Sequence, residues 1–272
     1  MALTYWIRHK QGIERECRSA SFYRDLFAEF LATFILMTVQ CSLPADWGKD
    51  NVGTVVQVSL GMSFVVGATA WTLGDFGGAH MNPAVTLSML LSGRITVLRA
   101  ALYAASQCSG SIAAASFIDY VHPENYTGTL AATLLHPQVT AWKGVLIETW
   151  LTFVLVLTIL GATDRVRKAH VYMPTLIIAM AVGIGVSCGY NSTGGSMNPA
   201  RSLGPAVVKA LWADHWVYWV GPLTGSALAT FVYHVMLDRV DNPGRRRTRE
   251  GNYGKEEKKG DNDADIQRLT SL

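Results

Sequence analysis

The tripeptide Asn-Pro-Ala occurs twice, at 82–84 and 198–200, in a chain built largely of apolar runs. Asn is a favoured N-cap, and Pro suits the first helical position because that position needs no N–H partner. Each tripeptide therefore predicts the start of a helix with an amide side chain, Asn82 or Asn198, at its tip. Such tips donate hydrogen bonds to polar molecules. We find no nucleophile paired with a base, which argues against an enzyme.

The residues around the two tripeptides also match. Residues 78–87 (GAHMNPAVTL) align with 194–203 (GGSMNPARSL), so we expect two related halves. Each tripeptide opens a short apolar stretch, at 83–92 and 199–209. These stretches of about ten residues are too short to cross a hydrocarbon core, which needs about 20. We therefore predict two short half-helices that enter the membrane without crossing it.

Longer apolar stretches flank the half-helices. The chain is 50% hydrophobic and 16% charged, whereas soluble domains are about 25% charged. We predict six transmembrane spans, at 26–43, 55–73, 97–118, 145–162, 173–189 and 217–237. A repeat within an apolar chain is typical of a membrane transporter or channel.

The basic residues predict the orientation of these spans. Nineteen of the 23 Lys and Arg lie before the first span, between spans two and three or at the start of span three, between four and five, and after the sixth. By the positive-inside rule both termini should be cytoplasmic, and we expect a plasma-membrane location. In each half the tripeptide follows the second span. That span ends on the cytoplasmic side of the membrane in the first half and on the outer side in the second, so the repeats must be inverted. The net charge of +3 reflects these segments and does not indicate nucleic-acid binding.

From about residue 22 to 237 the chain resembles the aquaporins, or major intrinsic proteins. The resemblance rests on both tripeptides, on Ala28-Glu29-Phe30, on Glu148, and on the runs 77–80 and 198–202. It implies an all-α membrane protein with six transmembrane helices and two re-entrant half-helices in inverted repeats, assembled as a homotetramer in the lipid bilayer.

The expected division of the chain follows. Residues 1–21 form a cytoplasmic N-terminal segment. Residues 22–238 form the channel domain, with repeat one at about 22–118 and repeat two at about 142–238. Residues 239–272 form a polar cytoplasmic tail that we predict to be disordered. The four cysteines lack metal-like spacing, so we predict no metal site and no cofactor.

The half-helix tips are the predicted pore centre. Two helix N-termini meeting there place two positive dipole ends at the midplane, which opposes cations. Asn82 and Asn198 would donate hydrogen bonds to each passing oxygen. Backbone carbonyls would replace the lost water contacts; we expect these from Gly78, Ala79, His80, Gly194, Gly195 and Ser196.

Two carboxylates lie within spans, where a charge needs a partner. The resemblance implies that Glu29 and Glu148 hydrogen-bond the backbone of the re-entrant loops. The alternative is a carboxylate near a helix end that reaches water. His80 has two interpretations as well: it braces its loop, or it acts as a pH gate because imidazole titrates near neutrality.

Arg201, directly after the second tripeptide, places a charge within the membrane domain, and such a charge needs an explanation because it is costly there. The resemblance places it in a selectivity filter, and the alternative is an arginine that snorkels to the membrane surface. The resemblance also implies filter positions at fixed distances from the tripeptides and the arginine, and counting these distances along this chain gives Met62, Val186 and Gly195. Water-selective members carry Phe at the position of Met62 and His at that of Val186. The filter here should therefore be wider and more apolar.

Other positions favour the water-channel type. Ser202 stands where glycerol-conducting members usually have Asp, and Ala206, Tyr218 and Trp219 also match water channels. We hypothesise a passive water channel that excludes protons and ions and whose widened filter also passes small neutral solutes such as glycerol or urea. Two alternatives remain, an aquaglyceroporin-like glycerol or urea channel and a junctional membrane protein of low permeability.

Three short motifs lie outside the spans. Asn125 begins Asn125-Tyr126-Thr127, an N-glycosylation acceptor on the predicted outer side. Thr248 follows Arg245-Arg246-Arg247 and fits a basophilic kinase site. The final Thr270-Ser271-Leu272 resembles a ligand for a PDZ domain. A terminus without any binding function explains these residues equally well.

Overall fold

The regular structure of this chain is helical throughout the residues described. The structure is a computed structural model, and it describes residues 16–44, 54–123, 128–164 and 173–237. Eight α-helices and a terminal π-helix follow one another in this part: α2 (Ala20–Ser42), α3 (Val55–Leu73), α4 (Pro83–Leu91), α5 (Val97–Val121), α6 (Ala141–Ala162), α7 (Met173–Gly189), α8 (Pro199–Lys209), α9 (Val217–Phe231) and η2 (Val232–Leu237).

The predicted fold class is confirmed: six long helices cover the six expected spans, and α4 and α8 are the two half-helices. Within the described residues, α2, α3, α6 and the stretch Val217–Leu237 are long and apolar enough to cross a membrane. Helix α7 is apolar but shorter. Helix α5 is less apolar because it carries polar side chains such as Gln107 and Ser111. Both are fully buried against neighbouring helices, so they do not face lipid.

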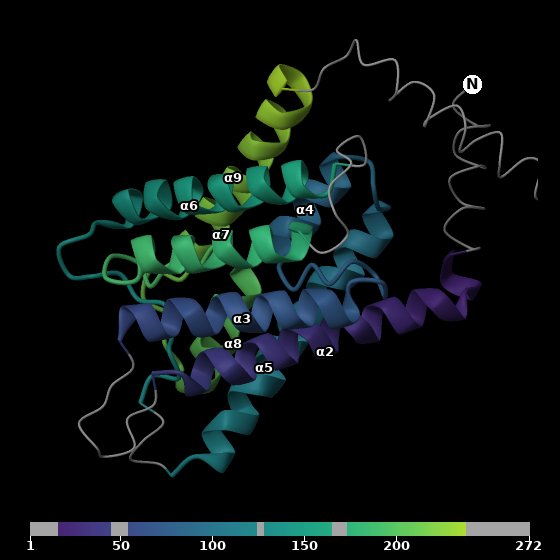
Figure 1. Cartoon of the computed structure of the whole chain (residues 1–272). Coiled ribbons are helices and arrows are strands. Elements are labelled where there is room, and N and C mark those ends of the chain that lie inside the picture. The colour runs from purple at the N-terminus through teal and green to yellow at the C-terminus, as the bar shows by residue number, and fades with distance from the viewer. Residues whose placement is uncertain (1–15, 45–53, 124–127, 165–172, 238–272) are drawn as a thin grey trace, which may run out of the picture.

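The packing follows the internal repeat. Helix α2 packs along α5 in the first half, and α6 packs along α9 in the second, while the equivalent helices α3 and α7 pack against each other. Figure 1 shows α3, α6 and α7 running side by side. Each half-helix contacts the last long helix of the other half, α4 with α9 and α8 with α5. The two repeats are therefore interlocked.

Specific polar contacts hold each half-helix against the long helix of the other repeat. The Ser226 hydroxyl on α9 donates to the backbone oxygen of Ala84 on α4 (2.5 Å), and Thr230 donates to Ser88 one turn further along (2.7 Å). On the other side, Lys209 at the end of α8 forms an ion pair with Asp119 of α5 (2.6 Å).

Glycines allow the close helix pairs within each repeat. A Cβ atom on Gly221 of α9 would lie 2.6 Å from the Cβ of Glu148 on α6, and one on Gly225 would lie 3.0 Å from the amide nitrogen of Phe153. On α5, a Cβ on Gly110 would lie 3.3 Å from the amide nitrogen of Phe34 on α2. These contacts are with backbone atoms or with a Cβ atom fixed to the backbone, so the neighbouring helix has little freedom to adjust.

Three of the sequence motifs lie outside the described residues. These are the glycosylation acceptor at Asn125, the kinase motif at Thr248, and the terminal Thr270, Ser271 and Leu272. They remain predictions from the sequence.

We predict that Gly225→Val destabilises the protein by forcing α9 away from α6. Overpacking of this kind costs about 1–3 kcal/mol. The thermal unfolding midpoint of the purified protein in detergent should fall, with a lower yield of folded protein. Leu228→Val, at an exposed position of the same helix, is the matched control and should leave both unchanged. An unaltered midpoint for Gly225→Val would contradict the close approach.

Candidate functional site

The two Asn-Pro-Ala segments begin the half-helices with the same capping geometry. The side-chain oxygen of Asn82 accepts from the backbone N–H of Ala84 at 2.8 Å. The side-chain oxygen of Asn198 accepts from the backbone N–H of Ala200 (3.0 Å) and of Arg201 (3.2 Å). Pro83 and Pro199 occupy the first helical turn. The sequence pattern thus sets the local structure at both tips.

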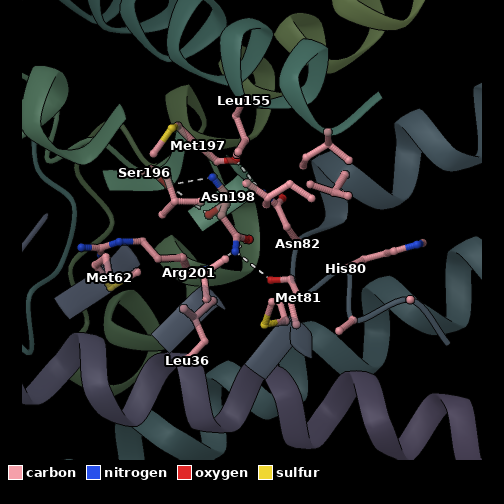
Figure 2. A pocket seen from close by; sticks show the side chains of 18 of the residues that line it. Leu36, Met62, His80, Met81, Asn82, Leu155, Ser196, Met197, Asn198 and Arg201 are labelled. Atoms are coloured by element: carbon pink, nitrogen blue, oxygen red, sulfur yellow. Dashed lines mark hydrogen bonds between the residues drawn. The ribbon is translucent and has the colours of Figure 1, made fainter. Parts of the chain in front are cut away.

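The tips also bond to each other's loops. The Asn82 amide donates to the backbone oxygen of Met197, and the Asn198 amide donates to that of Met81, each at 2.8 Å. The second bond is dashed in Figure 2. A carboxamide has two N–H groups. One is engaged with the opposite loop, which leaves one on each Asn for another acceptor.

The loops that lead into the tips have the same unusual backbone. Gly78, Ala79 and Met81 have φ values of 100°, 45° and 53°, and their counterparts Gly194, Gly195 and Met197 have 83°, 58° and 54°. Non-glycine residues seldom adopt positive φ, and such conformations persist only where the surroundings hold them. The surroundings must therefore fix both loops.

Two buried carboxylates supply that support. Glu29 on α2 accepts from the backbone N–H of His80 at 2.7 Å and of Met81 at 2.9 Å. Glu148 on α6 accepts from the backbone N–H of Ser196 at 3.0 Å and of Met197 at 2.7 Å. Both carboxylates are fully buried. This arrangement differs from the alternative in which they reach water.

Gln107 also belongs to the support of the first loop, a role that was not predicted from the sequence. The Gln107 amide on α5 donates to Glu29 Oε2 at 2.8 Å and to the Thr86 hydroxyl at 2.9 Å. His80 Nδ1 hydrogen-bonds the same hydroxyl at 3.1 Å, which braces the ring. In the second repeat, the Thr193 hydroxyl donates to Glu148 Oε1 at 2.6 Å. A lone amide inside an apolar span is the signal that points to Gln107.

A cavity of about 270 Å³ runs along the two tips. Its lining includes all four predicted filter residues, both tip asparagines and five of the six predicted carbonyl residues; Gly194 does not line it. In Figure 2, Asn82 and Asn198 lie near the centre, with Met62 and Arg201 to one side and His80 to the other. Among the described residues that line the cavity there is no carboxylate, whereas Arg94 and Arg201 are cationic.

Arg201 is held inside the protein. It is 6% exposed, whereas a snorkelling arginine would present its head group at the membrane surface. Its Nη1 donates to the backbone oxygen of Ala131 at 2.6 Å. Ala131 lies in the connection between α5 and α6 and itself has a φ of 54°. Nothing in the sequence marks this acceptor, because it is a backbone oxygen brought there by the fold.

The water-channel markers belong to the framework around the second loop. The Ser202 hydroxyl accepts from Thr133 at 2.8 Å and shares a hydrogen bond with Ser196 at 2.6 Å. The Tyr218 hydroxyl donates to the backbone oxygen of Thr193 at 2.9 Å. These buried contacts hold the segment that carries Gly195 and Arg201.

Trp219 lies in the first turn of α9, next to the connection between α8 and α9. Its indole N–H donates to Nε2 of His215 at 3.2 Å. Burial lowers the pKa of His215, which favours the neutral imidazole that accepts this bond.

Comparison with known proteins agrees with this architecture. Half-helices that meet inside a bundle of long apolar helices are the framework of a membrane channel. A family model described as major intrinsic protein matches residues 16–233. Aquaporin-5 of Mus musculus is 40% identical, covering 83% of this chain and 85% of that protein. Aquaporin-2 of Homo sapiens is also 40% identical, covering 82% of each.

The fold has a counterpart among solved structures as well. The X-ray structure of the aquaglyceroporin from Plasmodium falciparum superposes with a TM-score of 0.72 at 21% identity, covering 79% of this chain and 97% of that one. The chain belongs to the major intrinsic protein family, as its resemblance in sequence predicted. It is a multi-pass membrane channel for water or small solutes, and not an enzyme.

We predict that Glu148→Ala strongly lowers transport. The substitution leaves the N–H groups of Ser196 and Met197 and the Thr193 hydroxyl without their acceptor, at about 1–3 kcal/mol for each buried donor. The loop that carries Arg201 then loses its fixed position. Water flux into vesicles that contain the protein should fall at least about tenfold, since each 1.4 kcal/mol is worth a factor of ten.

Two variants control for this effect. Glu148→Gln keeps one acceptor oxygen and should give an intermediate flux. Trp150→Phe, at an exposed position of α6, should behave as the unmodified protein. Full water flux in Glu148→Ala would contradict the supporting role of the carboxylate.

Proposed function

We propose that the protein is a passive water channel that excludes protons and ions, and that its filter also passes small neutral solutes such as glycerol or urea. The observation that carries the proposal is the composition of the cavity wall. Arg201 is buried there together with the apolar side chains of Met62 and Val186 and the backbone of Gly195.

Water transport rests on the hydrogen bonds that the cavity offers. Each tip asparagine keeps one N–H that is not used by the opposite loop. Arg201 adds donors at the filter, and backbone oxygens of the two loops add acceptors. A water molecule that leaves its neighbours in bulk water therefore finds new hydrogen-bond partners. Asn82 and Asn198 both donate at the same point, so each passing water molecule turns its oxygen toward them. This orientation interrupts proton transfer along the row of water molecules in the pore.

Exclusion of cations rests on electrostatics. Two helix N-termini, each equivalent to about half a positive charge, meet at the cavity, and Arg201 adds a full one. The described lining contains no carboxylate to offset them. An ion channel or ion-coupled transporter would need such acidic groups along its path, so this composition disfavours that class.

Passage of solutes rests on two side chains. Val186 is smaller than the His of water-selective members and has no donor, and Met62 is flexible where those members have a rigid Phe. A wider and more apolar wall accommodates a carbon backbone, while Arg201 binds hydroxyl or carbonyl oxygens. Ser202 and Tyr218 are the residue types of water channels at these positions, which favours water as the main permeant.

We also propose a plasma-membrane homotetramer with both termini in the cytoplasm. The orientation rests on the basic residues of the expected cytoplasmic segments. Large apolar side chains such as Phe27, Phe64, Leu146 and Trp150 are exposed on the single chain, as expected for surfaces that meet lipid or other subunits. Glycosylation at Asn125, phosphorylation at Thr248 and PDZ binding at Thr270, Ser271 and Leu272 are proposed from the sequence alone.

We predict that the double variant Met62→Phe, Val186→His becomes selective for water. Glycerol and urea fluxes into vesicles should fall at least about tenfold, since small changes in pocket size are worth factors of about 10–200. Water flux should persist because the donors of Arg201 and the asparagines are retained. Phe64→Leu, at an exposed position of α3, is the matched control.

Two results would overturn the proposal. Water flux in the unmodified protein no faster than in empty vesicles would refute the water channel and favour a junctional protein. Water flux without any glycerol or urea flux would refute the wider filter.

A further inference from the structure

A second arginine, Arg94, lines the same cavity as Arg201 but comes from a different part of the chain. It lies just beyond the C-terminal end of the half-helix α4. The nine residues of α4, about 14 Å of helix, separate it from the tip at Asn82. The Arg94 side chain is exposed, so it is accessible to molecules that enter the cavity from this end.

The end of α4 determines where Arg94 lies. The backbone N–H of Gly93 donates to the oxygen of Leu90, and that of Arg94 donates to the oxygen of Met89, each at 2.9 Å. Gly93 has a φ of 65°, a conformation that glycine adopts readily. These two bonds around a left-handed residue form the Schellman motif, a common helix end. The backbone of Arg94 is therefore held in place by the way α4 ends.

Two side-chain contacts hold the guanidinium at the cavity wall. Arg94 Nη1 donates to the hydroxyl oxygen of Thr163 at 2.8 Å and to the sulfur of Met89 at 3.7 Å. The Thr163 hydroxyl donates in turn to the backbone oxygen of Ile159 at 2.8 Å. Thr163, Met89 and Ile159 all line the cavity. The positive charge of Arg94 is thus positioned beside the path of a permeant.

The two arginines lie toward opposite ends of the cavity. Thr163, which binds Arg94, directly follows α6. Ala131, which binds Arg201, lies in the connection that precedes α6. A helix of 22 residues is about 33 Å long, and Leu155 of this helix lines the cavity. The two guanidinium groups therefore act at different levels of the pore.

One carboxylate is close to Arg94 through its neighbour in sequence. Asp164 follows Thr163, but it does not line the cavity. Its Oδ2 accepts from the Tyr233 hydroxyl on η2 at 2.6 Å. No acidic side chain among the described lining residues offsets the charge of Arg94 inside the cavity.

We propose that Arg94 is a further specificity-determining residue, which repels cations at the end of the cavity opposite Arg201. A cation that enters from this end meets the guanidinium before it reaches the half-helix tips. A neutral molecule carries no net charge for the guanidinium to repel, so water and small solutes pass. This inference rests on the proposed exclusion of ions.

The contribution of Arg94 should depend on salt. Its side chain is exposed, whereas Arg201 is only 6% exposed. Dissolved ions screen an exposed charge over about 8 Å at about 0.15 M ionic strength, and over shorter distances in more concentrated salt. Removal of the charge should therefore have its largest effect in dilute salt. A purely steric role would not depend on salt in this way.

The test measures potassium current and water flux for variants of the full chain in lipid membranes. Arg201→Gln first weakens the barrier at the opposite end. In this background we expect Arg94→Met to raise the potassium current at least about threefold in dilute salt, and less in concentrated salt. Arg94→Lys keeps the charge and should not raise the current. Arg18→Gln, at an exposed arginine that does not line the cavity, is the matched control.

Folding is checked separately, by the thermal unfolding midpoint of each variant in detergent. Arg201→Ala provides a second background if Arg201→Gln does not fold. Arg94→Met alone should retain water flux and exclude potassium, because the half-helix tips and Arg201 remain.

The outcomes separate this inference from the proposed function. If Arg94→Met adds no current to the Arg201 background, the half-helix tips exclude cations without Arg94, and the inference is wrong while the proposed function stands. If Arg94→Lys and Arg94→Met raise the current equally, the side chain acts by its shape, which also overturns the inference. A potassium current in the unmodified protein would instead overturn the proposed exclusion of ions, and this inference with it.

Discussion

The irregular backbone in the middle of this bundle depends on two buried carboxylates. Hydrocarbon supplies no hydrogen bonds, so each unsatisfied backbone group at membrane depth costs several kcal/mol. Glu29 and Glu148 each accept from two consecutive backbone N–H groups of a re-entrant loop. These bonds allow the loops to leave helical geometry and to hold residues such as Met81 and Met197 at positive φ. The capped tips, the cavity and the position of Arg201 all follow from loops that are fixed in this way.

The second constraint is that neither repeat completes the site by itself. The Asn82 amide bonds the loop of the second repeat and the Asn198 amide bonds the loop of the first. Each half-helix also packs on the last long helix of the other repeat. The tips therefore reach their final geometry only when both repeats have assembled. The matching sequence segments share the Asn, Pro and Met that build these contacts, whereas Val85 in the first segment corresponds to Arg201 in the second.

Local patterns were sufficient to predict the helices but not all of their contacts. Apolar runs of about 20 residues gave the spans, and the capping chemistry of Asn and Pro gave the starts of α4 and α8. Other features depend on tertiary structure and have no local pattern. The backbone oxygen of Ala131 that binds Arg201 belongs to a connection with no distinctive sequence. The absence of Gly194 from the cavity wall likewise depends on how its loop turns.

The structure separates the control of permeant charge from the control of permeant size. The electrostatic barrier arises from the half-helix tips and Arg201, which are tied to the carboxylate supports and to both loops. Changing any of these groups disturbs backbone hydrogen bonds at the centre of the protein. Met62 and Val186 project from the regular helices α3 and α7, and no hydrogen bond in the described structure depends on their side chains. Their size is therefore free to vary while the barrier to cations is retained, and a family built on this framework is able to change its permeants through such positions without rebuilding its core.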